Sequence, residues 1–217
     1  MRIKHNSAMV KKFTDIILKK YYEESIKGRK GLHRGDAICC PLKTYYRLTG
    51  ELKPQYTSRD VGTLILGTLA HIALHKNFKF QEKVYKLQGI YVTVDAIYEE
   101  NGVEYPVETK STRKRIYRKE DLLESWIEQL SIAMAVMKVN KGYLMVLNII
   151  NFSLTVWEIT LTDEERQMFL QSCIWQIMSI TDAINKQDPS ILTPKYSECK
   201  YCPYRKQCKY YKKPPKK

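Results

Sequence analysis

Two carboxylates and a lysine occupy a pattern that could hold a metal ion. Asn101-Gly102 is the strongest signal for a two-residue hairpin loop in the sequence. If these residues form the loop, Asp95 stands directly opposite Glu108, because the loop fixes how the strands on either side pair. Lys110 lies on the same face as Glu108, since side chains alternate between the two faces of a strand. The sequence therefore predicts that these three side chains converge.

This trio has the residue types needed for metal-dependent cleavage of a phosphodiester. Opposed carboxylates would have their Cβ atoms roughly 5 Å apart, which destabilises a strand pair unless a cation lies between them. Mg²⁺ and Mn²⁺ prefer oxygen ligands of this kind, and a bound metal acidifies water. Lys110 could orient or deprotonate that water, or stabilise the charge of the transition state. A weak ion pair on a surface hairpin is the alternative for Glu108 and Lys110.

The cysteines are a second group that could do chemistry. In ECKYCPYRKQC three of them have the spacing C-x2-C-x5-C, and two more are adjacent in AICCPLK. Clustered cysteines in a reducing cytosol are more often metal ligands than disulfides. An iron-sulfur cluster accepts three close ligands and one distant one, and a zinc site usually takes two short pairs; free or disulfide-bonded cysteines are the third alternative. These five residues are Cys39, Cys40, Cys199, Cys202 and Cys208.

The chain is strongly basic. Its 217 residues include 37 Lys and Arg against 23 Asp and Glu, a formal charge of +14. This charge favours a polyanionic partner, most simply nucleic acid, although a solvated basic surface would also produce it. Tyrosines alternate with basic residues in KTYYRL, RKRIYRKE and KQCKYYKK. The rings could stack on the bases of a single strand, and the basic side chains could contact its phosphates. Because no signal peptide or membrane-spanning stretch is visible, we expect a cytoplasmic protein with no membrane partner.

An α/β core flanked by helices must position these residues. Apolar residues at helical spacing predict helices over residues 7–26, in GTLILGTLAHIALHKNF and in DLLESWIEQLSIAMAVMKV. A capping box from Thr162 to Glu165 begins a further long helix, in which Cys173 is expected to be a buried core thiol. The hairpin supplies two strands of a mixed sheet, and GYLMVLNII and FSLTVWEIT supply two more.

Taken in order, these motifs resemble the RecB-like branch of the PD-(D/E)xK nucleases and, within it, the CRISPR-associated iron-sulfur exonucleases, the Cas family numbered four. GTLAH, which ends at His71, is similar to the family's G-x-x-x-H motif. Asp95 and the E-x-K of Glu108 and Lys110 match the next two motifs, and Gln129 matches the start of Q-x-x-x-Y. The resemblance covers most of the chain.

Two positions depart from the family's pattern. Ala133 stands where the tyrosine of Q-x-x-x-Y is common, and Leu42 replaces the arginine of a Cys-Pro-Arg opening that CPLKTYYRL otherwise resembles. The tripeptide Arg34-Gly35-Asp36, a few residues earlier, matches an adhesion motif, and we interpret that match as chance.

The resemblance implies two bound groups. His71, Asp95 and Glu108 would hold Mn²⁺ or Mg²⁺, and Lys110 and Gln129 would complete the catalytic site. The C-terminal cysteines and one upstream cysteine would hold a 4Fe-4S cluster, for which Cys39 is the rival of the residue directly before the proline. The implied cluster ligands are Cys40, Cys199, Cys202 and Cys208.

The resemblance also implies a fold and a function. The fold would be a PD-(D/E)xK restriction-endonuclease-like core, a mixed β-sheet flanked by helices, with a C-terminal iron-sulfur segment. We expect an N-terminal helical segment with the upstream cluster cysteine over residues 1–60, a RecB-like nuclease core over residues 61–187, and the C-terminal cysteine cluster and basic tail over residues 188–217.

The implied activity is degradation of single-stranded DNA from its ends, 5′ to 3′, either in CRISPR spacer acquisition beside the integrase complex or in recombination of viral or mobile-element DNA. No Walker motif is present, so unwinding would need a partner helicase. The alternative is a non-catalytic nucleic-acid-binding module with a structural iron-sulfur or zinc site.

Overall fold

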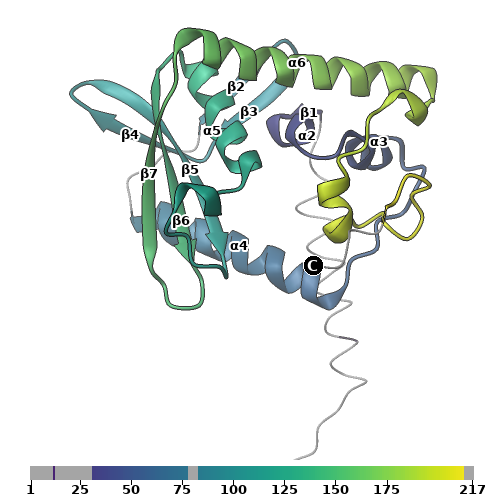
Figure 1. Cartoon of the computed structure of the whole chain (residues 1–217), viewed down its shortest axis with the longest axis horizontal. Coiled ribbons are helices and arrows are strands. Elements are labelled where there is room, and N and C mark those ends of the chain that lie inside the picture. Colours follow the sequence, from purple (N-terminus) through teal and green to yellow (C-terminus); the bar gives the residue numbers. More distant parts are fainter. Residues whose placement is uncertain (1–11, 13–30, 78–82, 213–217) are drawn as a thin grey trace, which may run out of the picture.

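The computed structural model describes residue 12, residues 31–77 and residues 83–212 (Figure 1). Apart from residue 12, the predicted helix over residues 7–26 lies outside the described residues. The helices are α2 Arg34–Ile38, α3 Pro41–Thr49, α4 Ser58–Asn77, α5 Glu124–Met137 and α6 Asp163–Lys186, with short 3-10 turns η2 Lys119–Asp121, η3 Pro189–Ile191 and η4 Tyr196–Tyr201. The strands are β1 Leu32–His33, β2 Lys83–Leu87, β3 Ile90–Val94, β4 Ala96–Glu100, β5 Val103–Thr112, β6 Lys141–Asn148 and β7 Leu154–Thr160.

The larger sheet has the strand order β4-β5-β6-β7. Strands β5 and β6 are parallel and the other neighbours are antiparallel, which confirms the predicted mixed sheet. The hairpin register is also as predicted, because Glu100 pairs with Val103 and Ala96 with Val107. Asn101 and Gly102 both have positive φ, 52° and 77°, the backbone conformation that this type of two-residue loop requires.

The strand that leads into this hairpin differs from the prediction. Asp95 was expected to pair directly with Glu108, but the ladder of β4 and β5 begins with Ala96 and Val107 and does not include Asp95. Strands β3 and β4 belong to different sheets, and β3 lies between β1 and β2 in the smaller one. The chain bends at Asp95, whose carboxylate accepts a hydrogen bond from the backbone N–H of Thr109 at 3.0 Å. A backbone donor bonded to a side chain has no strand partner at that point, so the pairing ends there.

Helix α5 fills the space between the two sheets. Its Leu130 and Met134 pack with Leu144 and Val146 of β6, and its Ile132 packs with β3 and α6. These are among the most deeply buried side chains of the protein. Apolar packing thus joins α5, which carries Gln129, to β3 on one side and to β6 on the other.

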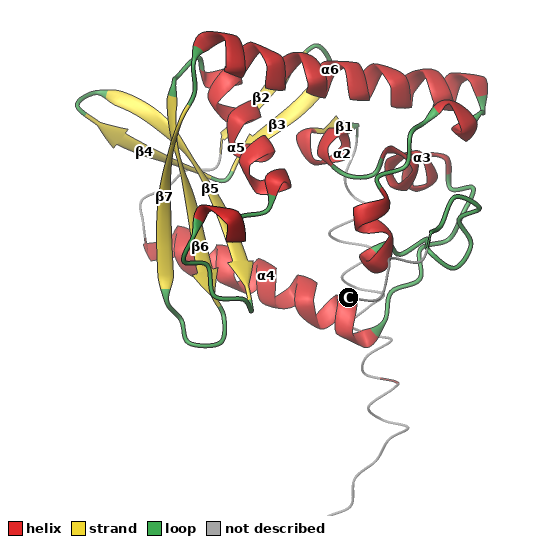
Figure 2. Ribbon diagram, viewed as in Figure 1, coloured by secondary structure: helices red, strands yellow, loops and turns green. Residues whose placement is uncertain are grey.

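The long helix α6 runs from the larger sheet to the C-terminal segment (Figure 2). It begins with the predicted capping box, in which Thr162 and Glu165 exchange hydrogen bonds. Near its other end, Ile180 packs against Tyr46 of α3 and Tyr204 of the C-terminal segment. Residues from early and late in the described chain thus form one core cluster beside the cysteines.

Candidate active site and cysteine pocket

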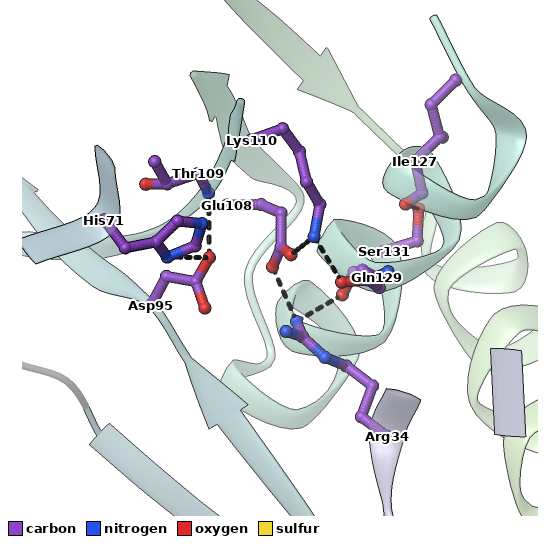
Figure 3. Close-up of polar contacts among 9 residues, drawn as sticks. All are labelled: Arg34, His71, Asp95, Glu108, Thr109, Lys110, Ile127, Gln129 and Ser131. Atoms are coloured by element: carbon purple, nitrogen blue, oxygen red, sulfur yellow. Dashed lines mark hydrogen bonds and ion pairs between the residues drawn. The ribbon is translucent and has the colours of Figure 1, made fainter. Parts of the chain in front are cut away.

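The structure brings together the five residues that were predicted from the sequence to form the catalytic site (Figure 3). His71 comes from α4, Asp95 from the bend between the sheets, Glu108 and Lys110 from β5, and Gln129 from α5. The Nδ1 atom of His71 lies 3.9 Å from Oδ2 of Asp95. Four separate elements thus converge on one place.

Glu108 lies at the centre of this group. It is almost fully buried, with 2% of its surface exposed. The Nζ atom of Lys110 lies 2.6 Å from its Oε1 and also donates a hydrogen bond of 2.6 Å to Oε1 of Gln129. The lysine is therefore held between a carboxylate of the sheet and an amide of α5.

Arg34, the first residue of α2, also belongs to this group, although no motif in the sequence predicted it. Its Nη1 atom lies 2.9 Å from Oε2 of Glu108 and donates a hydrogen bond of 2.8 Å to the backbone oxygen of Gln129. The arginine is itself 6% exposed. No spacing in the sequence indicates this contact, because Arg34 and Gln129 are 95 residues apart and Arg34 was assigned to a chance adhesion motif.

The surrounding charges act differently on the two carboxylates. Burial alone would raise the pKa of Glu108, but the positive charges of Arg34 and Lys110 outweigh burial and hold this pKa below its usual value. Burial raises the pKa of Asp95, and the negative charge of Glu108 raises it further against the opposing effect of the two cations. Additional positive charge beside Asp95 would therefore relieve an unfavourable interaction.

The donor set fits a hard divalent cation. Oε1 of Glu108 is buried and lies 2.6 Å from the Nζ atom of Lys110, but a carboxylate oxygen has a second electron pair that a metal could use. Asp95 and the imidazole of His71 add oxygen and nitrogen donors on the same side. No three His, Cys, Asp or Glu side chains among the described residues are already spaced around a common point, so side-chain rotation would have to complete the coordination.

Four cysteines line one small, open hollow between α3 and the C-terminal segment. The rings of Tyr46 and Tyr204 form part of its wall. Cys39 does not belong to this lining, and Cys173 is buried in α6, where burial raises its pKa to about 11, as expected of a core thiol. The cysteines of the hollow are Cys40, Cys199, Cys202 and Cys208, the set implied by the resemblance.

Backbone donors around Cys40 partly offset the burial that raises its pKa. Cys40 is the N-cap of α3. Burial raises the pKa of Cys40, and backbone N–H groups of Lys195, Lys43 and Leu42 act in the opposite direction. Donors directed at a sulfur stabilise the deprotonated form that metal or cluster binding requires. Four thiols are the donor types that an iron-sulfur cluster or a zinc ion takes, but no three of them are already spaced around a common point in the part of the chain that the structure describes.

A buried glutamate and a lysine on one strand of a mixed sheet, beside an aspartate and helical donors, are residue types that hydrolytic sites use. The chain belongs to the PD-(D/E)XK nuclease superfamily, whose family model matches residues 74–209. The matched part contains Asp95, Glu108, Lys110 and Gln129.

The fold has solved relatives. A solved structure described as "Crystal structure of SSO0001" is 22% identical, with a TM-score of 0.61, and the alignment covers 93% of this chain and 98% of that chain. At this identity the similarity establishes a common fold. No curated protein matches the sequence. Among the residues that the structure describes, no helix is long and apolar enough to cross a membrane.

Proposed function

We propose that the protein is a divalent-metal-dependent deoxyribonuclease that degrades single-stranded DNA from its ends, in the 5′ to 3′ direction. The observation that carries the proposal is the contact of Glu108 with Lys110, beside Asp95, in a chain of the nuclease superfamily. The residues proposed for metal binding are His71, Asp95 and Glu108, with Mn²⁺ or Mg²⁺ as the ion.

When bound, such an ion polarises the phosphodiester and acidifies a water molecule. Lys110 contributes a positive charge whose position is fixed by Glu108 and Gln129, so little reorganisation is needed when negative charge develops on the phosphate. Asp95 is held by the backbone N–H of Thr109 and keeps its orientation next to His71. Arg34 neutralises the side of Glu108 that Lys110 does not reach.

The preference for a single strand rests on charge and on exposed aromatic rings. The formal charge of +14 favours a polyanion. Tyr117 is 67% exposed in the basic segment between β5 and α5. Unstacked bases of a single strand can stack on such rings, whereas the bases of a duplex are already stacked.

We further propose that the four cysteines of the hollow hold a 4Fe-4S cluster. Its ligands would come from both ends of the described chain, so the cluster would fasten the C-terminal segment to α3. The biological setting would be CRISPR spacer acquisition with the integrase complex, or recombination of viral or mobile-element DNA, with a helicase as partner where duplex must be opened.

A second candidate is a non-catalytic nucleic-acid-binding module with a structural iron-sulfur or zinc site. The departures at Ala133 and Leu42 favour it. Both side chains are almost fully buried, and Leu42 lines the cysteine hollow rather than the nuclease site. A module of this kind would bind DNA with unchanged affinity after Glu108→Gln and would cut no DNA in either form.

The proposal is tested with anaerobically purified protein, Mn²⁺ and single-stranded DNA labelled at either end, with circular single-stranded DNA as control. We expect immediate release of a short labelled product from the 5′-labelled strand, gradual shortening of the 3′-labelled strand, and an intact circle. Cleavage of the circle would establish endonucleolytic cutting instead, and no cleavage of any substrate would favour the binding module.

A further inference from the structure

Helix α2 connects the two sites. Its first residue, Arg34, reaches Glu108, and its last residue, Ile38, directly precedes Cys39 and Cys40. A helix of five residues is too short to be stable by its own hydrogen bonds. The position of α2, and with it that of Arg34, must therefore come from its contacts with the rest of the protein.

One of these contacts comes from the C-terminal segment. The Nζ atom of Lys195 donates a hydrogen bond of 2.7 Å to the backbone oxygen of Ile38, at the C-terminal end of α2. A cation at this position also interacts favourably with the partial negative charge of the helix end. In the same segment, Glu198 accepts a hydrogen bond of 3.1 Å from the backbone N–H of Cys40.

Lys195 also reaches the helix on the other side of the site. Its Nζ atom lies 3.6 Å from Oε2 of Glu128 on α5. The next residue of α5 is Gln129. Its backbone oxygen accepts a hydrogen bond from Arg34, and its side-chain oxygen accepts one from Lys110. One lysine of the C-terminal segment thus contacts α2, which carries Arg34, and α5, whose Gln129 accepts hydrogen bonds from both cations beside Glu108.

We propose that Lys195 is a positioning residue of the nuclease site: it couples the C-terminal cysteine segment to Glu108 through α2 and Arg34. The inference rests on the proposed nuclease function. Because Arg34 holds Oε2 of Glu108, it leaves Oε1 directed at Lys110. Loosening α2 lets Arg34 move and gives Glu108 a choice of orientations, although no catalytic residue has been changed.

The test uses full-length, anaerobically purified protein and the variants Lys195→Met, Arg34→Met and the double variant. Removal of an outer partner of a metal ligand lowers activity or metal affinity about 10-fold to 100-fold, so we expect Arg34→Met to reduce kcat about 30-fold. Lys195→Met should reduce kcat about 5-fold with KM for DNA unchanged. Lys195→Arg should restore most of this loss, because arginine can donate to the same carbonyl.

The double variant distinguishes coupling from general destabilisation. If Lys195 acts through Arg34, the double variant loses about as much kcat as Arg34→Met alone, whereas independent effects would multiply to about 150-fold. The matched control is Lys186→Met, which removes an exposed lysine paired with Asp182 at 2.9 Å near the end of α6. This control should leave kcat unchanged. Combined with Arg34→Met, it should therefore give the same loss of kcat as Arg34→Met alone, as independent effects do.

Two measurements do not depend on cleavage. Hydrogen exchange of the amides of residues 35–40 should become faster in Lys195→Met and stay unchanged in Lys186→Met. Binding of Mn²⁺, followed by loss of the free-ion signal in electron paramagnetic resonance, should weaken about 10-fold in Arg34→Met.

Unchanged exchange of the α2 amides in Lys195→Met, or multiplicative losses in the double variant, would overturn the coupling. A wild-type protein that neither binds Mn²⁺ nor cuts DNA would instead contradict the proposed nuclease function, even if the exchange result shows that Lys195 holds α2.

Discussion

The nuclease site and the cysteine pocket both collect side chains from distant parts of the chain, but they are held together in different ways. In the nuclease site, Glu108 is buried between the charges of Arg34 and Lys110. In the cysteine pocket, thiols line a hollow walled by Tyr46 and Tyr204. Ion pairs thus fix the orientation of the side chains in the nuclease site, whereas the cysteine pocket is formed where two chain segments pack together.

This difference predicts that catalysis and the attachment of the C-terminal segment can be disrupted separately. A change inside the nuclease site should remove catalysis and leave the cysteine segment in place, since the site lies on strands and helices with their own apolar core. A change among the cysteines should release the C-terminal segment first and affect catalysis through it. The following variants test that separation, from the largest expected effect to the smallest.

Lys110→Met should have the largest effect on cleavage. It removes the charge that Glu108 and Gln129 hold in place, and loss of a positioned group that stabilises transition-state charge costs about 10²-fold to 10³-fold in kcat. The measurement is the rate of single-strand cleavage at saturating DNA and Mn²⁺.

The matched control for Lys110 is Lys141→Met. Lys141 also lies on the larger sheet with a carboxylate oxygen, that of Glu100, 2.6 Å from its Nζ atom, but it is not part of the site. Equal losses of cleavage rate in the two variants would show that removing any paired lysine from this sheet slows cleavage, and would contradict a special role for Lys110.

His71→Ala should weaken metal binding and slow cleavage about 10-fold to 100-fold. The reason is that His71 supplies the one nitrogen donor beside Asp95 among the residues proposed for the metal. Titration of Mn²⁺ against cleavage rate measures the effect. His75→Ala, four residues further along the chain, is the control and should leave both quantities nearly unchanged; equal weakening would contradict the assignment of His71.

Cys40→Ala should bleach the visible absorbance expected of the cluster and lower the melting temperature, because a structural metal centre contributes directly to folding free energy. Cys39→Ala should keep the absorbance, since Cys39 does not line the hollow. Visible spectra of the two anaerobically purified variants decide between these residues. Bleaching by Cys39→Ala alone would assign the fourth ligand to Cys39.

Thr162→Ala should have the smallest effect and should touch neither site directly. It removes the side-chain acceptor for the backbone N–H of Glu165 at the start of α6, which costs about 1 kcal/mol of folding free energy. Thermal unfolding should shift down by about 3 °C with cleavage and spectrum unchanged. A loss of cleavage would mean that α6 transmits its stability to the nuclease site.

The sequence predicted the parts of the site that depend on local rules. The loop Asn101-Gly102 determined the pairing of Glu100 with Val103, and strand alternation then placed Glu108 and Lys110 on one face. The capping box of α6 followed from the types of two residues. In each case the residues that predict the feature lie within a few positions of the feature itself.

Two features could not be predicted because they depend on tertiary contacts. The bend at Asp95 follows from a hydrogen bond with the N–H of Thr109, which competes with strand pairing. The contact of Arg34 with Glu108 depends on how α2 packs between α5 and α6, and no periodicity in the sequence records that packing. Arg34 drew attention only as part of a tripeptide that matched an adhesion motif by chance, so the residue was assigned no role.

The central claim is that Glu108 serves the chemistry and is not needed to hold the cysteine segment or its bound group in place. The most direct measurement compares wild type with Glu108→Gln, both purified anaerobically, by visible spectrum and by cleavage of end-labelled single-stranded DNA with Mn²⁺. We predict identical brown spectra, with cleavage by the wild type and a loss of about 10³-fold or more in the variant. Equal cleavage by both proteins, or loss of the brown colour in Glu108→Gln, would contradict the claim.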